Sequence, residues 1–126
     1  MKNITKNLQF ILLTIIQKNN PSWVTYLSAT SVYGDHQGEW VDELSKTNPT
    51  SKNGLDRLRS EKSWLTFANE KKIPLQIFRL SGIYSNRRNI LVKLKSGKAN
   101  IINKKNHFFS RIHVCLLYTS PSPRDQ

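Results

Sequence analysis

The sequence predicts an α/β fold in which a parallel sheet is flanked by helices. Residues 23–27 form an uncharged run of β-formers, which is typical of a strand buried on both faces of a parallel sheet. Apolar residues recur with helical spacing on either side of this run, over 4–18 and 51–70, and a second strand-like run covers 73–80. This helix–strand–helix–strand order indicates a parallel α/β unit.

Residues 4–18 are predicted to form a well-buried helix that ends before Pro21. The apolar side chains follow the i, i+3, i+4, i+7, i+8 spacing of one helix face (Leu8, Ile11, Leu12, Ile15 and Ile16). A signal peptide is the alternative, but the apolar core is short and no small-residue cleavage site follows it. The segment is also too short to span a bilayer.

Residues 34–50 are predicted to form a polar loop that Trp40 and Val41 anchor on the core. The acidic residues and His36 in this loop raise the alternative of a metal site. Hard-ion loops space their ligands more tightly, so we expect a solvated loop without a metal.

The helix over 51–70 is predicted to begin at Thr50 or Ser51 and to end at Lys71 and Lys72. Its buried face is expected to consist mainly of leucines, with an aromatic residue alongside (Leu55, Leu58, Leu65, Ala68 and Trp64).

The C-terminal part of the chain is predicted to contain a short basic helix over 86–97, which stops at Gly97. Ile90, Leu91 and Leu94 are expected to face inward from this helix. Short strands are expected over 100–103 and 108–114, the second of them without a pairing partner.

Three segments of the chain carry motifs of one known enzyme family. They are YLSATSVYGD over 26–35, FRLSGIY over 78–84 and FSRIHV over 109–114. In order and spacing they resemble the fifth strand, the sixth strand and a later segment of the extended short-chain dehydrogenases/reductases, the NAD-dependent epimerase/dehydratase group. VYGDHQGEWVDE over 32–43 is most similar to the atypical, YeeZ-like members.

The resemblance covers roughly residues 23–114 and implies a partial Rossmann-type parallel sheet. Residues 1–114 would form the C-terminal part of an NAD(P)-binding domain. None of the five glycines lies in the Gly-x-Gly-x-x-Gly spacing, so we expect this chain to be a fragment that lacks the N-terminal, nucleotide-binding half. Residues 115–126 resemble a translated sequencing adapter and are expected to be a non-native tail, the alternative being a flexible Ser/Pro terminus. The only cysteine, Cys115, lies in this tail, so no disulfide is expected.

The resemblance implies that NAD or NADP and a small-molecule substrate bind where the strands end. Cofactor contacts are expected from the ends of both strands and from the intervening helix (Ser28, Ala29, Thr30, Arg57, Leu80, Ser81 and Gly82). Arg111 is expected to contact the substrate. Alternatively, Arg57 is a solvated residue on the surface of the helix.

The catalytic Tyr-x-x-x-Lys of the family is replaced here by Asn53 and Arg57. Asparagine cannot act as an acid or base, and arginine stays protonated. Thr30 and Tyr33 are therefore the nearest candidates for catalytic residues, although Tyr33 could equally be a packed side chain. We expect weak or absent activity with cofactor binding retained in the intact protein.

The net charge of +12 leaves a nucleic-acid partner or a membrane surface as alternatives. Lysine, asparagine and isoleucine are all abundant, as AT-rich coding DNA would produce, so neither partner is expected. The absence of cysteine outside the tail fits a reducing compartment, and the protein is expected to be cytoplasmic. The leading hypothesis is a truncated, inactive NAD(P)-dependent oxidoreductase or epimerase-like enzyme. The alternatives are a non-catalytic dinucleotide sensor of the same fold and, more weakly, a basic nucleic-acid-binding fragment.

Overall fold

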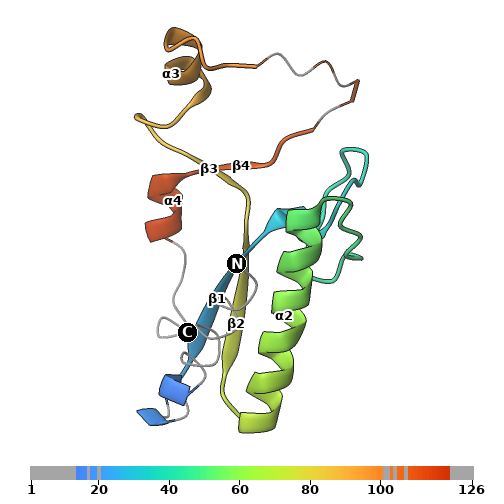
Figure 1. The fold of residues 1–126 in the computed structure, drawn as a ribbon, viewed down its shortest axis with the longest axis vertical. Coiled ribbons are helices and arrows are strands. Elements are labelled where there is room, and N and C mark those ends of the chain that lie inside the picture. The colour runs from blue at the N-terminus through green and yellow to red at the C-terminus, as the bar shows by residue number, and fades with distance from the viewer. Residues whose placement is uncertain are drawn as a thin grey trace.

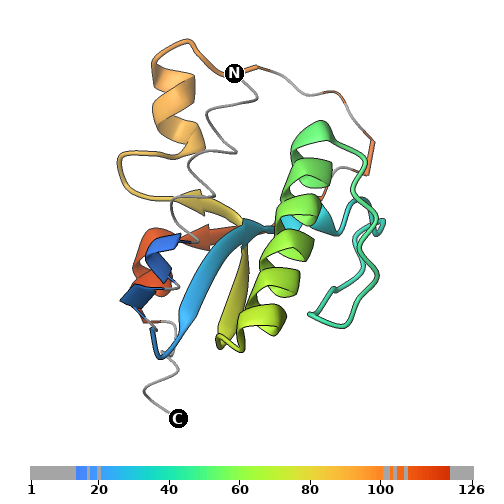
Figure 2. The same ribbon diagram turned by 60° about the horizontal axis from the view of Figure 1, so that its bottom comes forward.

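The structure, a computed structural model, describes residues 14–16, 18–19, 21–100, 103, 105–106 and 108–119. Its centre is a parallel pair of strands, β1 (Val24–Ala29) and β2 (Leu75–Leu80). Helix α2 (Lys52–Lys71) connects them and packs along one face of the pair (Figures 1 and 2). The predicted α/β fold with parallel strands and flanking helices is thus confirmed.

The register of the two strands decides which side chains face α2. Ser28 is paired with Arg79, and the Tyr26 ring stacks on Trp64 of α2 with ring centroids 5.9 Å apart. Leu27 points to the opposite face and is 55% exposed. The prediction that this strand is buried on both faces is therefore wrong, because α2 covers only one of them.

Both ends of α2 are capped by the residues that the sequence indicated. The Ser51 side chain accepts a hydrogen bond from the Gly54 amide at 3.1 Å, and Lys72 ends the helix in the left-handed region at φ 53°. The predicted start at Ser51 and the predicted end at Lys71 and Lys72 are confirmed.

The buried face of α2 differs from the predicted leucine face. Gly54, Glu61 and Ala68 are the buried residues, so the prediction is confirmed for Ala68. Leu55 and Leu65 are 42% and 45% exposed, so it is wrong for these two leucines. A Cβ atom on Gly54 would lie only 2.5 Å from the Ser31 carbonyl oxygen. At Gly54 the helix therefore comes close to the turn that follows β1, and the leucines lie on its flank.

A second parallel pair joins β3 (Gly82–Tyr84) to β4 (Arg111–His113). The prediction that the strand near the C-terminus lacks a partner is therefore wrong. Ser81 alone separates β2 from β3, so one continuous segment contributes to both pairs. Helix α4 (Val114–Tyr118) follows β4 directly and includes Cys115.

Helix α3 (Ile90–Lys95) is shorter than predicted and begins at the Asn89 cap. Its apolar residues Ile90, Leu91 and Leu94 are 56%, 65% and 58% exposed, so the prediction that they face inward is wrong. The physical reason is visible in Figure 1, where α3 lies away from the β1–β2 pair. Gly97 follows the helix at φ 66°, as its predicted stop requires.

The remaining predictions are tested only in part. Residues 14–16 and 18–19 are helical, whereas the rest of the predicted helix over 4–18 lies outside the described residues. Asn100 and Asn103 are not in a strand, and residues 101–102 lie outside the described part, as do residues 120–126. Within the described segments, no helix combines the length and the apolar character needed to cross a membrane.

Candidate functional site

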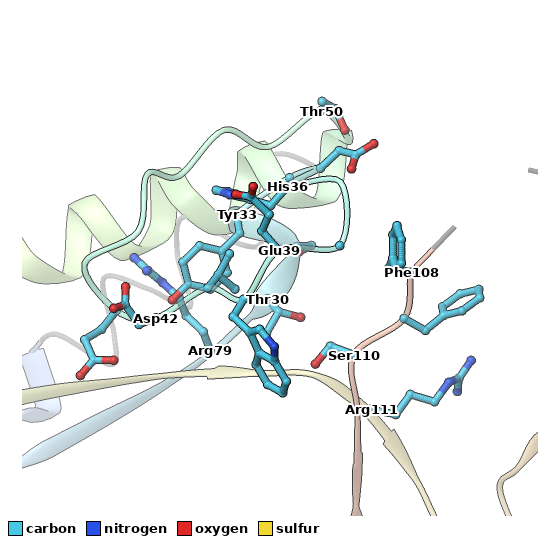
Figure 3. Close-up of a pocket in the computed structure, with 18 of the residues that line it drawn as sticks. Thr30, Tyr33, His36, Glu39, Asp42, Thr50, Arg79, Phe108, Ser110 and Arg111 are labelled. Carbon is cyan, nitrogen blue, oxygen red and sulfur yellow. The ribbon is translucent and has the colours of Figure 1, made fainter. Parts of the chain in front are cut away.

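A pocket of about 1390 Å³ lies at the carboxyl ends of β1 and β2 (Figure 3). One wall is the 3-10 turn η1 (Thr30–Val32) with the loop that follows it, over residues 33–43. The edge of β2 over residues 76–79 forms the base, and residues 108–111 form the opposite wall. In open α/β sheets, ligands bind at this end of the strands.

Tyr33 forms a packed corner of this pocket. Its side chain is buried, with the residue 7% exposed, and the Arg79 guanidinium carbon lies 4.8 Å from the centre of its ring. The His36 ring meets Tyr33 edge-on with centroids 6.3 Å apart. Figure 3 shows these side chains grouped beside Thr30. The guanidinium on the ring face forms a cation–π contact that fixes the ring as part of the wall.

Arg79 is itself held by a buried carboxylate. Its Nε and Nη2 atoms donate to the two oxygens of Glu61 at 3.2 and 2.9 Å, and Glu61 is 1% exposed. The hydrogen bond to Glu61, with a smaller one to Tyr33, raises the pKa of Arg79 above its usual value despite partial burial. Arg79 therefore remains charged, with Glu61 compensating that charge. Its role at the pocket is to support Tyr33.

The loop over 34–50 is fixed by its own backbone and side-chain contacts. Gly34 turns the chain at φ 81°, and the Asn48 amide donates to the Tyr33 carbonyl at 3.0 Å. The Ser45 hydroxyl donates to Asp42 at 2.7 Å, and this bond lowers the pKa of Asp42. Trp40 is fully exposed, at 101%, so the prediction that it anchors the loop on the core is wrong. The polar turns hold the loop without it.

All four acidic residues of the loop line the pocket (Asp35, Glu39, Asp42 and Glu43). Among the described residues, no group of three or more His, Cys, Asp or Glu side chains is placed to hold a metal ion.

The opposite wall is brought to the pocket by the β3–β4 pair. The Gly82 amide donates to the Ser110 carbonyl at 3.1 Å, and this bond sets the position of Arg111 at the start of β4. The Arg111 guanidinium carbon lies 5.3 Å from the centre of the Phe109 ring. Arg111, predicted to contact a substrate, thus lines the same pocket as Thr30 and Tyr33.

A smaller hollow of about 720 Å³ adjoins the first, since Ser31 and Ser51 line both. Ala29, Asn53 and Arg57 line only this second hollow. Arg57 is an exposed residue of α2, and its Nη1 atom donates to the Leu27 carbonyl of β1 at 3.0 Å.

The other predicted cofactor residues line neither hollow. Leu80 is the last residue of β2, Ser81 follows it and Gly82 begins β3, and all three lie outside both hollows. Ser28 is 4% exposed on the side of β1 that faces α2, and its hydroxyl has no hydrogen-bond partner among the described residues.

Glu61 and Arg79 were missed by the sequence reasoning, although two signals were present. Arg79 is the only charged residue in a strand otherwise made of uncharged residues, where burial requires a partner. Glu61 lies seven residues after Gly54 and seven before Ala68, which places all three on one helix face. Together these signals indicate a buried pair between α2 and β2.

Comparison with known proteins shows the fold. A structure of a functionally unknown conserved protein from Silicibacter pomeroyi is 39% identical, with a TM-score of 0.71, and the match covers 90% of this chain and 42% of that protein. A UDP-N-acetylglucosamine 4-epimerase from Methanobrevibacter ruminantium, solved in complex with UDP-N-acetylmuramic acid, is 15% identical, with a TM-score of 0.70 over 87% of this chain and 39% of the epimerase.

No described protein family and no curated protein matches the sequence. The chain spans about 42% and 39% of the lengths of the two proteins that it resembles in structure. It therefore shares the α/β fold of both over less than half of each.

Proposed function

We propose that this chain is the substrate-side part of a longer, atypical (YeeZ-like) member of the short-chain dehydrogenase/reductase superfamily, an NAD(P)-dependent oxidoreductase of the epimerase/dehydratase type. The observation that carries the proposal is the convergence of Thr30, Tyr33 and Arg111 on one pocket at the carboxyl ends of parallel strands. These residues come from segments far apart in the sequence. The shared fold with a nucleotide-sugar epimerase supports this placement.

In this proposal each of the three side chains has a distinct role. The Thr30 hydroxyl orients a substrate carbonyl or hydroxyl by a hydrogen bond, and Tyr33 exchanges the proton. Arg111 pairs with an anionic part of the substrate. Asn53 lines only the second hollow, so its position supports the view that the proton-transfer group is not at residue 53. Because Tyr33 is largely buried, we infer that the activity of the longer protein is weak or absent.

The residues present fit one end of NAD(P), the nicotinamide and its ribose. Arg57 donates one N–H to the Leu27 carbonyl, and its other N–H groups are available at the second hollow beside Ala29. Gly82 lies outside both hollows, and a Cβ atom there would meet only ordinary contacts, the nearest at 3.4 Å, so Gly82 does not add to this fit. Bound NAD(P) would supply the hydride acceptor. The pyrophosphate requires a glycine-rich turn that this sequence does not contain.

The test is a titration of this chain with NAD and with NADP, in which binding is measured by calorimetry and by tryptophan fluorescence. We expect no binding in the micromolar range, because only the ribose-side contacts are available. Joining an upstream strand and Gly-rich turn should create micromolar binding, and an Arg57→Ala change should weaken it. Micromolar affinity of the present chain for NAD or NADP would contradict the proposal that it offers only the ribose-side contacts.

A specific observation favours a second candidate, a non-catalytic dinucleotide-binding sensor. The two family positions that carry proton transfer are occupied here by Asn53 and Arg57, which replace tyrosine and lysine. The Arg57 side chain also donates a hydrogen bond to the backbone carbonyl of Leu27. Cofactor binding without turnover in the longer chain would select the sensor. Robust hydride transfer abolished by Asn53→Ala would show that residue 53 carries the chemistry and that our assignment of the site is wrong.

A further inference from the structure

The pocket at the ends of β1 and β2 lies between two groups of elements. Packing among the labelled helices and strands joins η1, β1, β2 and α2 into one body and joins β3, β4 and α4 into another. Ser81 alone separates β2 from β3, so the chain runs directly from the first body into the second there. Thr30 and Tyr33 line the pocket from the first body, and Arg111 lines it from the second. The distance between these side chains therefore depends on what holds the two bodies together beyond Ser81.

Phe108 supplies a contact of this kind across the pocket. A Cβ atom on Gly38 would lie 2.6, 2.7 and 2.8 Å from the Cζ, Cε2 and Cε1 atoms of Phe108. The tip of the ring therefore packs directly against the Cα atom of Gly38, in the loop of the first body. Gly38 has φ 91°, and a residue without a Cβ atom permits both this conformation and this close approach. Figure 3 shows Phe108 on the wall opposite Tyr33 and His36.

Gly38 belongs to a turn that is tied to the rest of the first body. The Glu39 amide donates to the His36 carbonyl at 3.0 Å, and this bond closes the turn around Gly38. The His36 ring in turn meets the Tyr33 ring edge-on, and Arg79 packs on the face of that ring. The position of Gly38 is thereby linked to the packed corner of the pocket.

Phe108 stands at the same time close to the strand that carries Arg111. Arg111, the first residue of β4, comes three residues after Phe108 and is paired with Gly82 of β3. The Gly82 amide also donates to the Ser110 carbonyl at 3.1 Å, which leaves little slack between Phe108 and the strand. The Phe108 ring is 62% exposed and so is not part of a core. Its contact with Gly38 therefore links the wall that carries Arg111 to the loop on the other side of the pocket.

We propose that Phe108 is a positioning residue of the pocket, because its ring, packed against Gly38, holds the Arg111 wall at a fixed distance from Thr30 and Tyr33. We call the contact between Gly38 and Phe108 the clasp. The inference rests on the proposed function for the ligand that the two walls share, whereas the clasp itself can be tested without a ligand. When the clasp is broken, the link at Ser81 remains, but the separation of the two walls can vary. One ligand then contacts both walls only part of the time.

The first measurement is the distance between the two bodies, obtained by pulsed electron paramagnetic resonance between two spin labels. One label is attached to Cys115 of α4, which is exposed and is the single cysteine of the chain, and the other to α2 through Lys62→Cys at an exposed position. We expect a single narrow distance distribution when the clasp is intact and a broader one in Phe108→Ala. Leu44→Ala is the matched control, because it removes an apolar side chain that is 91% exposed on the same loop and does not line the pocket. This control should leave the distribution narrow.

Three further variants separate the contact from the two residues that form it. Phe108→Met should keep the distribution narrow, because a long and flexible apolar side chain can still reach Gly38. Gly38→Ala should broaden the distribution, because the added Cβ atom displaces the ring tip. Adding Gly38→Ala to Phe108→Ala should broaden it no further, since no ring is left to displace, whereas additive effects would show that the two residues act independently. Far-ultraviolet circular dichroism establishes that each variant is folded.

The second measurement is an NMR titration of the same proteins with inorganic pyrophosphate, followed at the amides of Thr30 and Arg111. If the clasped arrangement is populated only about one tenth of the time in Phe108→Ala, the affinity should fall about tenfold, because the apparent dissociation constant varies inversely with the competent fraction. The distance distribution gives that fraction independently, so the two measurements must agree.

The outcomes distinguish the clasp from the proposed function. An unchanged distance distribution in Phe108→Ala, or an unchanged affinity for pyrophosphate despite a broadened distribution, would overturn the positioning role of Phe108. A broadened distribution in Phe108→Ala with no binding of pyrophosphate to any of the proteins would support the clasp and would overturn the proposed function instead.

Discussion

Removing Arg79 while retaining Glu61 should destabilise the chain more than any exposed charge change. Arg79→Met leaves the Glu61 carboxylate 1% exposed and without a cation. Breaking a buried ion pair on one side costs about 3–5 kcal/mol. The Arg79 side chain is 22% exposed, so we expect the lower end of that range, about 3 kcal/mol.

The chain offers a matched control on the same helix. Arg59 and Asp56 form an ion pair at 3.4 Å, with side chains 77% and 56% exposed. Arg59→Met should therefore cost less than about 1 kcal/mol. The double variant Glu61→Leu, Arg79→Met should recover most of the loss, because apolar residues of similar volume can replace a buried pair at little cost.

The assay is urea unfolding followed by circular dichroism at helical wavelengths, with the free energy of unfolding obtained by linear extrapolation. A stabilising osmolyte such as trimethylamine N-oxide keeps the folded baseline measurable for the weaker variants. If Arg79→Met costs no more than Arg59→Met, the buried pair does not hold α2 against β2, and our account of the Tyr33 corner fails with it.

Two further predictions concern the loop. Gly34→Ala should destabilise the chain by more than about 2 kcal/mol, because the residue has φ 81° and an added Cβ would collide with the Asn48 carbonyl. The control Gly97→Ala, at φ 66° with open space around the residue, should cost about 1 kcal/mol. Equal losses of unfolding free energy in urea for the two variants would contradict the predicted collision. The pKa of Asp42 should rise toward 3.8 in Ser45→Ala when followed by carbon NMR of the carboxyl group. Since folding lowers the pKa of Asp42, its ionised carboxylate stabilises the turn above pH 3.8, and this contribution is lost as the pH falls through the pKa of the folded state. An unchanged pKa of Asp42 in the variant would show that the Ser45 hydroxyl is not the cause of the lowered value.

The sequence predicted the elements that depend on local pattern. The parallel β1–β2 pair, the caps of α2 and the stop at Gly97 all follow from periodicity, capping residues and glycine, and the structure contains each of them. These features are set by neighbours within a few residues along the chain.

Features that depend on distant contacts were not predicted. Leu55 and Leu65 have the apolar side chains and the spacing expected of a buried helix face. Gly54 lies so close to the Ser31 carbonyl oxygen that α2 turns a different face inward and leaves these leucines exposed. Trp40 and Ile90, Leu91 and Leu94 of α3 are exposed because no other element of the described segments covers them, and amphipathic spacing alone cannot reveal this.

The candidate site was predicted as a set of separate motifs. The pairing of β3 with β4, which brings Arg111 to the pocket of Thr30 and Tyr33, joins segments almost thirty residues apart. No local pattern specifies such a pairing. Glu61, the buried partner of Arg79, was missed for a different reason, because its seven-residue spacing from Gly54 and Ala68 was not used.

The most direct test of the central claim is an NMR titration of the chain with inorganic pyrophosphate, an anionic probe of the site around Arg111. If the pocket at the ends of β1 and β2 is the substrate site, the amides of Thr30, Tyr33, Ser110 and Arg111 should shift together, with a dissociation constant of about 1 mM. Arg111→Ala should abolish these shifts, and Lys62→Ala should not. Shifts confined to the basic residues around α3, or no shifts at all, would contradict the claim.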